Sequence, residues 1–539
     1  MGKVIKFKGW LSIKTITIFQ TSDMHGYIFP TSYMTRNENQ PFGLLKAANN
    51  YNKEKAGLAE DSSILISNGD TIQGSPFAHY LHSKYNSAGR LTNLFNRVGY
   101  DAGIPGNHEF NYGQEYVKEG YEHLELPILC ANILNEQGEP FFGKAYEIFE
   151  RSDIKIAVLG LTTQYIPHWE HPDHIIGLTF KSAVETAKEY VPMLSEMADV
   201  VVVSYHGGFE VDLDTLEPID VNEGENEGYA LIKEVEGIDV LLTGHQHNVI
   251  SRVIDGVAVL MPGDKCRYLG KITLQFNKYD GEDSWTLVDA KPELIPTKVE
   301  DELLQEEAEY LAPLNNAVED WLDEPVGKVH GDMLIRNVEE ARIADHPYVE
   351  FIHRVQNYFG QTEISATSLF NNDAKGFPEN VTIRNILNNY PFPNTLAVVK
   401  LTGAEIKAAL ELSAEFFMLD ETGKIEMSPE WLYPKSKLYN YDMYKGIEYV
   451  VDVSKPVGER IVKLHYHHAP INLEEEFEVT LNQYRAIGGG DYTMFDSSKI
   501  VREVNIEMNM LIAKYFEIFK GVEATCNHNF RVVNGAEYY

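Results

Sequence analysis

A chain of 539 residues, 44% of them hydrophobic, is too long for one ordinary hydrophobic core and predicts two globular domains. Its 81 acidic and 46 basic residues give a net charge of −35 at pH 7, which argues against nucleic-acid polymers and membranes as partners. The three cysteines lie far apart and form no CxxC pair, so neither a disulfide framework nor a thiolate metal site is expected.

The opening stretch MGKVIKFKGWLSIKTITIF contains basic residues, but Lys14 and several threonines interrupt the apolar run that a signal peptide needs. No stretch is typical of a transmembrane helix. We therefore expect a cytoplasmic protein; a secreted or surface form whose leader has been removed is the alternative.

Five apolar runs in the first half each end in residues that can bind a metal ion. They are KTITIFQTSDMH with Asp23 and His25, SSILISNGD with Asp70, DAGIPGNHEF with Asn107 and His108, ADVVVVSYHGG with His206, and GIDVLLTGHQH with His245 and His247. These runs are short, continuous and rich in β-branched residues, which predicts buried strands. Segments 42–57 and 181–197 are compatible with helices between them. The first half is therefore predicted to be α/β.

Polar groups at the carboxyl ends of strands in such a domain converge on one site. The runs supply two carboxylates, one amide oxygen and four imidazoles, which are ligands for hard or zinc-like divalent cations. This set is sufficient for two ions that share the Asp70 carboxylate. Zinc, manganese, cobalt and iron all remain open, because nitrogen and oxygen ligands accept each of them.

The motifs DxH, GD, GNHE, HGG and GHxH occur in this order, which resembles the calcineurin-like metallophosphoesterases of the 5'-nucleotidase family. The resemblance implies two divalent metal ions with Asp70 as the shared bridge. One ion would be held by Asp23, His25, Asp70 and His247, and the other by Asp70, Asn107, His206 and His245.

By the same resemblance, His108 stabilises the transition state beside the leaving oxygen. Many 5'-nucleotidases of this group have an Asp in GNHEFD that pairs with this histidine, whereas GNHEFNYG has Asn111 here. An amide can orient an imidazole but does not stabilise its cation as a carboxylate does, so a strict dyad is not expected. We assign His108 and Asn111 as the catalytic residues. The motif GNHEFNYG resembles the corresponding motif of the 2',3'-cyclic-nucleotide 2'-phosphodiesterase/3'-nucleotidase branch.

Near residue 297 the character of the sequence changes. Thr297 and Glu300 predict a capping box, and apolar residues at helical spacing predict a connector helix that Pro313 breaks or kinks. A second α/β or α+β unit, richer in Tyr, Asn and Gly, follows. The predicted boundaries are 1–295 for the catalytic domain, 296–325 for the connector and 326–539 for the C-terminal domain.

Segments 382–414, 438–456 and 482–492 resemble the C-terminal nucleotide-binding domain of the same family. Two aromatic rings can grip a base, with stacking contributing about 1–3 kcal/mol per ring. Tyr439 and Tyr484 are the candidates for this clamp. Tyr441 would share the face of Tyr439 in an extended segment, so the choice between these two stays open. The further substrate-binding candidates are Arg384, Arg485, Gly488 and Gly489.

The resemblance implies an α/β fold: a four-layer metallophosphoesterase β-sandwich with flanking helices, joined by the connector helix to a C-terminal α/β 5'-nucleotidase-type substrate-binding domain. It also implies that a metal-bound hydroxide hydrolyses the phosphoester of a small nucleotide or nucleoside phosphate. The expected substrates are 2',3'-cyclic nucleotides and 3'-nucleotides. A 5'-nucleotidase or UDP-sugar hydrolase is one alternative, and an inactive nucleotide-binding protein is another. The oligomeric state stays open.

Two histidine clusters are predicted to be solvated or structural, because neither has a carboxylate or cysteine partner at the usual spacing. They are His168, His171 and His174, and His465, His467 and His468.

Overall fold

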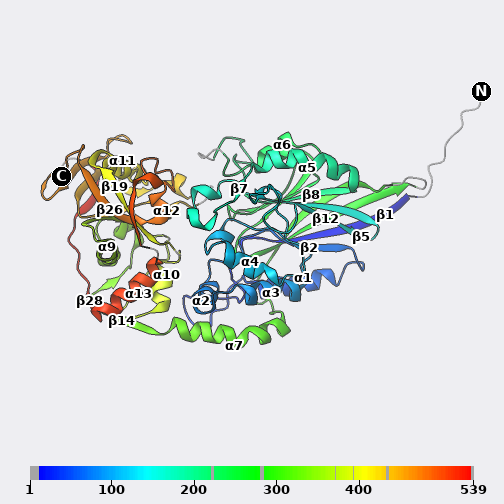
Figure 1. The fold of residues 1–539 in the computed structure, drawn as a ribbon, viewed down its shortest axis with the longest axis horizontal. Helices are drawn as coiled ribbons and strands as arrows, with labels where there is room; N and C mark the ends of the chain where they lie inside the picture. The colour runs from blue at the N-terminus through cyan, green and yellow to red at the C-terminus, as the bar shows by residue number, and fades with distance from the viewer. Residues whose placement is uncertain are drawn as a thin grey trace, which may run out of the picture. The chain divides into compact units, whose positions relative to one another are not determined.

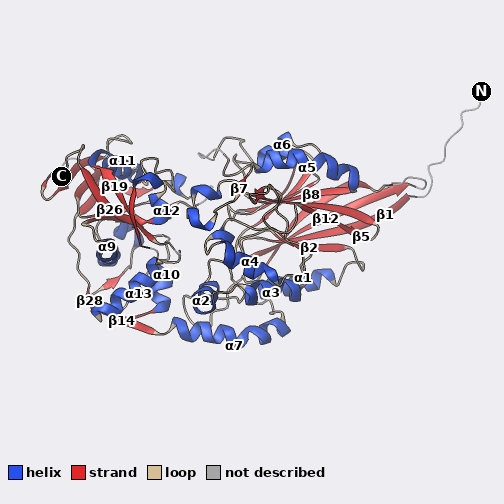
Figure 2. Ribbon diagram, in the orientation of Figure 1, coloured by secondary structure: helices blue, strands red, loops and turns tan. Residues whose placement is uncertain are grey.

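The computed structural model describes residues 11–219, 224–279, 284–370, 372–392, 394–432, 436–504 and 506–535. The chain divides into two compact units, Met1–Asn316 and Ala317–Tyr539 (Figures 1 and 2). Residues 1–10, on which the prediction of a missing leader partly depends, lie outside the described residues. In the parts of the chain that are described, no helix combines the length and the hydropathy needed to cross a membrane.

Two mixed sheets form the centre of the first unit. The first sheet has the order β13 (Thr286–Pro296), β12 (Tyr268–Tyr279), β1 (Leu11–Thr21), β2 (Ser63–Ser67) and β3 (Ala102–Gly103). The second has the order β10 (Val249–Ile254), β11 (Val257–Pro262), β9 (Val240–Leu242), β8 (Val200–His206), β6 (Ile154–Thr162) and β5 (Tyr146–Arg151). β1, β2 and β3 are parallel to one another, as are β6, β8, β9 and β11.

The alternation of side chains along the strands creates the layers. Val200 and Val202 of β8 belong to the core between the sheets, together with Ile16 and Ile64 of the first sheet. Val201 and the other odd positions of β8 belong to a second core beneath the outer helices. Successive residues of a strand face opposite sides, so a run of valines fills both cores. Each fully buried valine contributes about 1.5–3 kcal/mol.

Helices cover the outer face of each sheet, which makes the four layers (Figure 1). α5 (Ala183–Met197) and α6 (Gly228–Glu234) cover the second sheet, and α1 (Leu44–Lys55) packs on the first sheet, where Tyr51 contacts Phe19 edge to face. The two predicted helical segments are therefore confirmed. The remaining elements of this unit are α2 (Pro76–Tyr85), α3 (Gly89–Val98), α4 (Gln114–Glu122) and the pair β4 (Ile133–Leu134) and β7 (Thr179–Phe180).

The connector is one helix, α7 (Gln305–Leu322), which contains Pro313 without a break and also contains the boundary between the units. The capping box predicted at Thr297 does not form. Its hydroxyl donates to the carbonyl of Cys266 at 2.8 Å, and the residues up to Leu304 are not helical. A tertiary acceptor therefore replaces the local cap.

The second unit is α/β, as expected, and its described residues share one hydrophobic core. Its main sheet has the order β22 (Met443–Lys445), β16 (Ile364–Thr367), β26 (Glu476–Asn482), β19 (Leu396–Thr402) and β27 (Ile500–Val504). A second sheet consists of β25 (Ala469–Pro470), β24 (Ile461–Tyr466), β23 (Glu448–Asp452) and β29 (Phe530–Val533), and a third of β18 (Asn380–Thr382), β14 (Pro325–His330) and β28 (Gly521–Glu523). Short pairs join β15 (Met333–Leu334) to β17 (Gly376–Phe377) and β20 (Phe417–Leu419) to β21 (Ile425–Met427).

The helices of this unit are α8 (Val338–Ile343), α9 (Pro347–Gly360), α10 (Ile383–Asn389), α11 (Gly403–Ala414), α12 (Gln483–Ala486) and α13 (Met508–Phe519). Capping boxes start two of them, from Thr382 to Asn385 at α10 and from Thr402 to Glu405 at α11. Each box satisfies backbone donors that the first helical turn leaves unpaired.

Candidate active site

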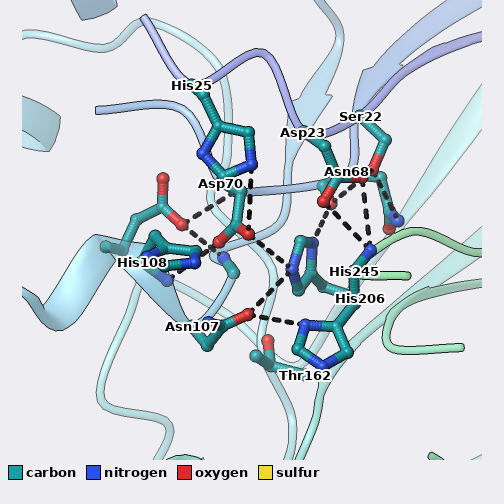
Figure 3. A network of polar contacts seen from close by, with 12 residues as sticks. Ser22, Asp23, His25, Asn68, Asp70, Asn107, His108, Thr162, His206 and His245 are labelled. Carbon is teal, nitrogen blue, oxygen red and sulfur yellow. Dashed lines mark hydrogen bonds and ion pairs between the residues drawn. The ribbon is translucent and has the colours of Figure 1, made fainter. Parts of the chain in front are cut away.

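The predicted metal ligands follow strands of both sheets in the first unit. From the first sheet come Asp23 and His25 after β1, Asp70 after β2 and Asn107 after β3; from the second come His206 at the end of β8, and His245 and His247 after β9. All five predicted strands exist, and their carboxyl ends meet at one place, where most of these side chains are drawn in Figure 3.

The structure brings these side chains close enough to share ions. Asp23, His25, Asp70 and His247 form one group whose ligand atoms lie within 4.8 Å of one another, and Asp70, His206 and His245 form a second. Asp70 belongs to both. These are the only groups of three or more such side chains within ligand distance among the described residues, so neither histidine cluster that was predicted to be structural is one of them.

Asn107 lies against the second group, because its Oδ1 is 2.9 Å from His245 Nδ1 and 3.3 Å from His206 Nε2. All seven predicted ligands therefore lie together.

The Asp70 carboxylate is the centre of the site. Its Oδ1 accepts a hydrogen bond from the backbone N–H of His108 at 2.8 Å. Its Oδ2 is buried and has no hydrogen-bond partner among the described residues, yet it lies 3.3 Å from His206 Nε2 and 3.8 Å from His25 Nε2. A buried carboxylate oxygen of this kind is costly unless a cation compensates it. The donor set therefore fits divalent metal ions.

Backbone carbonyls orient two of the imidazoles for this purpose. His25 Nδ1 lies 3.0 Å from the carbonyl of Gln73, and His206 Nδ1 lies 2.5 Å from the carbonyl of Asn68. A carbonyl can only accept, so Nδ1 carries a hydrogen and Nε2 is the nitrogen that faces Asp70 and is available to a metal ion. Histidine ligands of metals are commonly held in this way.

Most ligand residues adopt a strained backbone conformation. The φ angles are 51° for Asp23, 50° for His25, 53° for Asp70, 65° for His245 and 59° for His247. Non-glycine residues in this left-handed region each cost on the order of 1–3 kcal/mol. The surrounding fold thus holds these five residues in turns that direct their side chains to one point.

Two glycines allow the loops to approach this closely. Gly69 has φ of +89°, and a Cβ placed there would lie 2.6 Å from His206 Nδ1 and from the backbone N of Gly106. A Cβ at Gly106 would overlap the Asp70 carboxylate. Any side chain at either position would displace a ligand.

The electrostatics of the cluster favour positive charge. Burial acts to raise the pKa of Asp23, but the hydrogen bond and charge of His247 outweigh it and lower that pKa to about 2. Burial acts to lower the pKa of His206, but the Asp70 carboxylate raises it to about 10. Two buried carboxylates that stay ionised therefore attract either a proton on His206 or a cation that displaces it.

Glu109, which was not predicted as a site residue, ties the loops together. Its carboxylate accepts from the backbone N–H groups of Asp70 at 2.9 Å, Thr71 at 2.5 Å and Gly106 at 2.6 Å. Burial, and then the neighbouring Asp70, raise the pKa of this carboxyl to about 7. The glutamate of the motif GNHE was the signal in the sequence, because it directly follows the assigned residues Asn107 and His108.

Two further neighbours of His245 were also missed. Glu225 Oε1 lies 3.2 Å from His245 Nε2, and the ring of Trp169 stacks on the His245 ring with centroids 5.3 Å apart. Trp169 directly follows His168, one of the three clustered histidines that were predicted to be solvated or structural. Nothing in the local sequence indicates that this loop reaches the site.

The predicted catalytic pair is in contact. His108 Nδ1 lies 2.7 Å from Asn111 Oδ1, and Asn111 Nδ2 donates to Glu170 Oε2 at 2.7 Å. The His108 ring also lies against the His25 ring, with centroids 5.2 Å apart. An amide that contacts the imidazole was expected, whereas the carboxylate beyond it was not.

In the second unit, Tyr439 and Tyr484 lie next to each other and are half-buried. Their centroids are 6.2 Å apart and their planes meet at 68°. A base sandwiched between two rings needs parallel planes about 7 Å apart, twice the contact distance of roughly 3.5 Å. The two rings are therefore adjacent but not arranged as a parallel clamp. Phe392 contacts Tyr439 with centroids 6.1 Å apart and was not predicted.

Tyr441 does not join them, which corrects that candidate. Leu438–Asn440 is a 3₁₀ helix rather than an extended segment, so Tyr439 and Tyr441 do not share a face. The Tyr441 ring is buried against Phe416, and its hydroxyl donates to the carbonyl of Arg342 at 2.8 Å.

The two predicted arginines are held in ion pairs inside the second unit. Arg384 contacts Glu319 at 2.7 Å and Asp323 at 2.8 Å, and Arg485 contacts Asp442 at 2.6 Å. Arg485 also stacks on the Tyr492 ring and donates to the carbonyl of Gly489. Both guanidinium groups therefore have structural partners and are buried, and their contact with substrate stays a prediction.

The glycine loop is shaped by its own neighbours. Gly488 has φ of +97°, and a Cβ at Gly489 would meet the Tyr484 ring at 2.6 Å. These two glycines thus let the loop pack against Tyr484.

Two family models match the chain, the calcineurin-like phosphoesterase over residues 16–249 and the 5'-nucleotidase C-terminal domain over residues 325–497. The crystal structure of a putative 5'-nucleotidase from Staphylococcus aureus in complex with alpha-ketoglutarate is similar, with a TM-score of 0.89 and 36% identity over 97% of this chain and 100% of that chain. The 2',3'-cyclic-nucleotide 2'-phosphodiesterase/3'-nucleotidase of Salmonella typhimurium is 28% identical over 88% of this chain and 81% of its own length. The trifunctional nucleotide phosphoesterase protein YfkN of Bacillus subtilis is 28% identical over 96% of this chain, which spans 39% of that longer protein.

Proposed function

Since this chain belongs to the calcineurin-like phosphoesterases that carry a 5'-nucleotidase C-terminal domain, as its motifs predicted, we propose that it hydrolyses 2',3'-cyclic nucleotides and 3'-nucleotides. The chain is a hydrolase of nucleotide phosphoesters, like the relatives named above. The observation that carries the proposal is the convergence of the seven predicted ligands around the unpartnered Oδ2 of Asp70. The choice of substrate rests on Asn111 in GNHEFNYG.

Two divalent ions would be held here. Asp23, His25, Asp70 and His247 would ligate one, and Asp70, Asn107, His206 and His245 the other. When bound, such ions would supply an activated water as nucleophile and neutralise the charge that develops on the phosphoryl group. Zinc, manganese, cobalt and iron all suit these ligands.

Other residues of the chain would act on the leaving oxygen and on the base. His108 would act at the leaving oxygen through Nε2, because Asn111 occupies Nδ1. Tyr439 and Tyr484 would stack on the base, with Phe392 as a third aromatic contact. Because the two tyrosine rings are not parallel, one of them would have to turn to accept a base between them.

Release of phosphate from three esters tests the substrate choice. We expect turnover of 2',3'-cyclic AMP and 3'-AMP, with 5'-AMP the poorest substrate. Turnover of 5'-AMP or a UDP-sugar alone would replace this proposal with the 5'-nucleotidase alternative, which the name of the Staphylococcus aureus relative supports. Tight binding of nucleotides without any turnover in the presence of each of the four metals would favour an inactive binding protein.

The base site has its own test. Tyr439→Ala or Tyr484→Ala should raise KM for a nucleotide roughly 5- to 150-fold, which corresponds to about 1–3 kcal/mol of stacking. Neither should change KM for p-nitrophenyl phosphate, which has no base. Tyr358→Ala is the matched control, because this ring is 46% exposed on α9 in the same unit. Equal effects on both esters would argue against stacking.

A further inference from the structure

A buried carboxylate lies one hydrogen bond beyond the catalytic pair. Asn111 Nδ2 donates to Glu170 Oε2 at 2.7 Å. Glu170 Oε1 accepts from the backbone N–H of His171 at 2.9 Å and lies 2.7 Å from His174 Nδ1. Glu170 is only 6% exposed, so these partners fix its position. We propose that Glu170 is a positioning residue that sets the orientation of the Asn111 amide and, through it, keeps a hydrogen on His108 Nδ1.

The first step of the argument concerns the amide. The two ends of an asparagine side chain have nearly the same shape, so either end can face a neighbour unless the hydrogen bonds decide. An ionised carboxylate can only accept. Glu170 therefore requires the NH₂ end of Asn111, and this turns Oδ1 toward His108.

The second step concerns the imidazole. Asn111 Oδ1 lies 2.7 Å from His108 Nδ1 and can only accept, so Nδ1 must carry a hydrogen. Nε2 is then the nitrogen left to face a leaving oxygen, and it can give up a hydrogen there and leave a neutral imidazole only when Nδ1 also carries one. A reversed amide would place a donor against Nδ1, which could then carry no hydrogen. One carboxylate thus decides whether His108 can act as a proton donor through Nε2.

The sequence alone suggested that Asn111 deprives the histidine of a carboxylate partner. The structure assigns that partner to a different loop, 59 positions further along the chain, acting through the amide. The inference rests on the proposed function, because it concerns the residue that acts at the leaving group.

The test compares a nucleotide, whose leaving alkoxide needs a hydrogen-bond or proton donor, with p-nitrophenyl phosphate, whose leaving group needs none. Glu170→Leu should lower kcat for 3'-AMP about 10- to 100-fold, the usual range for an outer-shell partner, and change KM less than about threefold. The loss on p-nitrophenyl phosphate should be under about threefold.

Glu411→Leu is the control for simple loss of a buried carboxylate. Glu411 is 9% exposed and accepts from the backbone N–H groups of Arg460 and Ile461, in the second unit. Its loss should lower stability without changing the ratio of the two substrates. Equal losses on both esters in Glu170→Leu, or no loss on either, would overturn the inference. Failure of the wild type on every nucleotide would instead overturn the proposed function.

If Glu170→Leu does not fold, an exchange of the two groups answers the same question. Asn111→Asp alone places two carboxylates in contact and should lose at least about tenfold in kcat on 3'-AMP. Asn111→Asp with Glu170→Gln restores one acceptor beside His108 and one donor beyond it, and should return kcat to within about threefold of wild type. A double variant as impaired as Asn111→Asp alone would overturn the inference.

Discussion

Asp70 in the first unit and Asp442 in the second are both buried carboxylates, but they differ in what they contact. In the first unit, Asp70 Oδ2 faces two imidazole nitrogens without a hydrogen bond, and five of the ligand residues have left-handed backbones. In the second unit, Arg485 and Asp442 are equally buried but satisfy each other at 2.6 Å. A buried polar group that has a protein partner can be explained by its contribution to stability. A buried polar group without a partner, on a residue with a strained backbone, indicates a ligand-binding site. A buried carboxylate therefore indicates function in one unit and stability in the other.

The largest effect should come from the centre of the ligand cluster. Asp70→Ala removes the carboxylate that both groups share, so metal content should fall to background at both positions. Activity should fall by more than the roughly 10- to 100-fold loss that is typical when a residue that only orients a metal ligand is removed. Metal analysis of the purified protein and phosphate release measure this. Asp289→Ala, at an exposed position on β13, is the control. Full activity of Asp70→Ala would show that the unpartnered carboxylate of the first unit is not needed for function, which contradicts the comparison of the two units.

The next largest effect should come from the ion pair in the second unit. Arg485→Met leaves Asp442 buried without its partner and should cost about 3–5 kcal/mol of unfolding free energy. Arg485→Met with Asp442→Leu should recover most of this. Chemical denaturation measures it. If Arg485 contacted substrate instead, KM for nucleotides would rise while stability stayed unchanged, and the two units would no longer differ in this way.

A smaller effect should separate backbone strain from crowding at the site. Gly69→Ala and Gly256→Ala both place a side chain at φ near +90°, but only Gly69 has neighbours within reach of the new Cβ. Gly69→Ala should therefore lower metal affinity about 10- to 100-fold. Gly256→Ala should leave metal affinity as in the wild type. Titration with manganese measures both, and equal losses would show that strain alone is responsible.

The smallest effect concerns a buried histidine of the second unit. Burial lowers the pKa of His353 to about 3, and its Nδ1 lies 2.8 Å from Ser365 Oγ. Below pH 6.5 the unfolded chain binds a proton there that the folded chain does not, so stability falls as the pH drops from 6.5 toward 3. The contribution of His353 to the slope of the unfolding free energy against pH should approach about 1.4 kcal/mol per pH unit.

His353→Gln cannot titrate and should flatten this slope. Denaturation of both proteins at pH 7.5, 6.5 and 5.5 measures the difference. Parallel stability curves for the variant and the wild type would contradict the assignment.

Local signals were sufficient to predict the catalytic half. β-branched runs specify the strands, and loops directly after strand ends meet at one edge, so Asp23, Asp70 and His206 could be placed together without coordinates. The family could be recognised because its motifs lie in those same loops. Glu170 and Trp169 could not be predicted, since they reach the site from a loop whose position depends on tertiary packing.

The second unit shows the limits of the same reasoning. Tyr441 was paired with Tyr439 on the assumption of an extended segment, but one turn of 3₁₀ helix separates their directions. The charge partner of Arg485 lies 43 positions earlier in the chain, and no periodicity connects the two. Thr297 matches a helix cap in sequence but donates to a carbonyl from another strand connection. In each case a long-range contact outweighs a local preference.

The origin of the ligands from both sheets has a consequence for the lifetime of the fold. Each group of ligands takes at least one side chain from either sheet, so a bound cation acts as a cross-link between them. An ion that binds only the native form stabilises it by about 2.7 kcal/mol when its free concentration is a hundred times Kd. Starving the protein of metal would then loosen the sandwich as well as stop turnover, and the supply of metal would govern how long the enzyme persists.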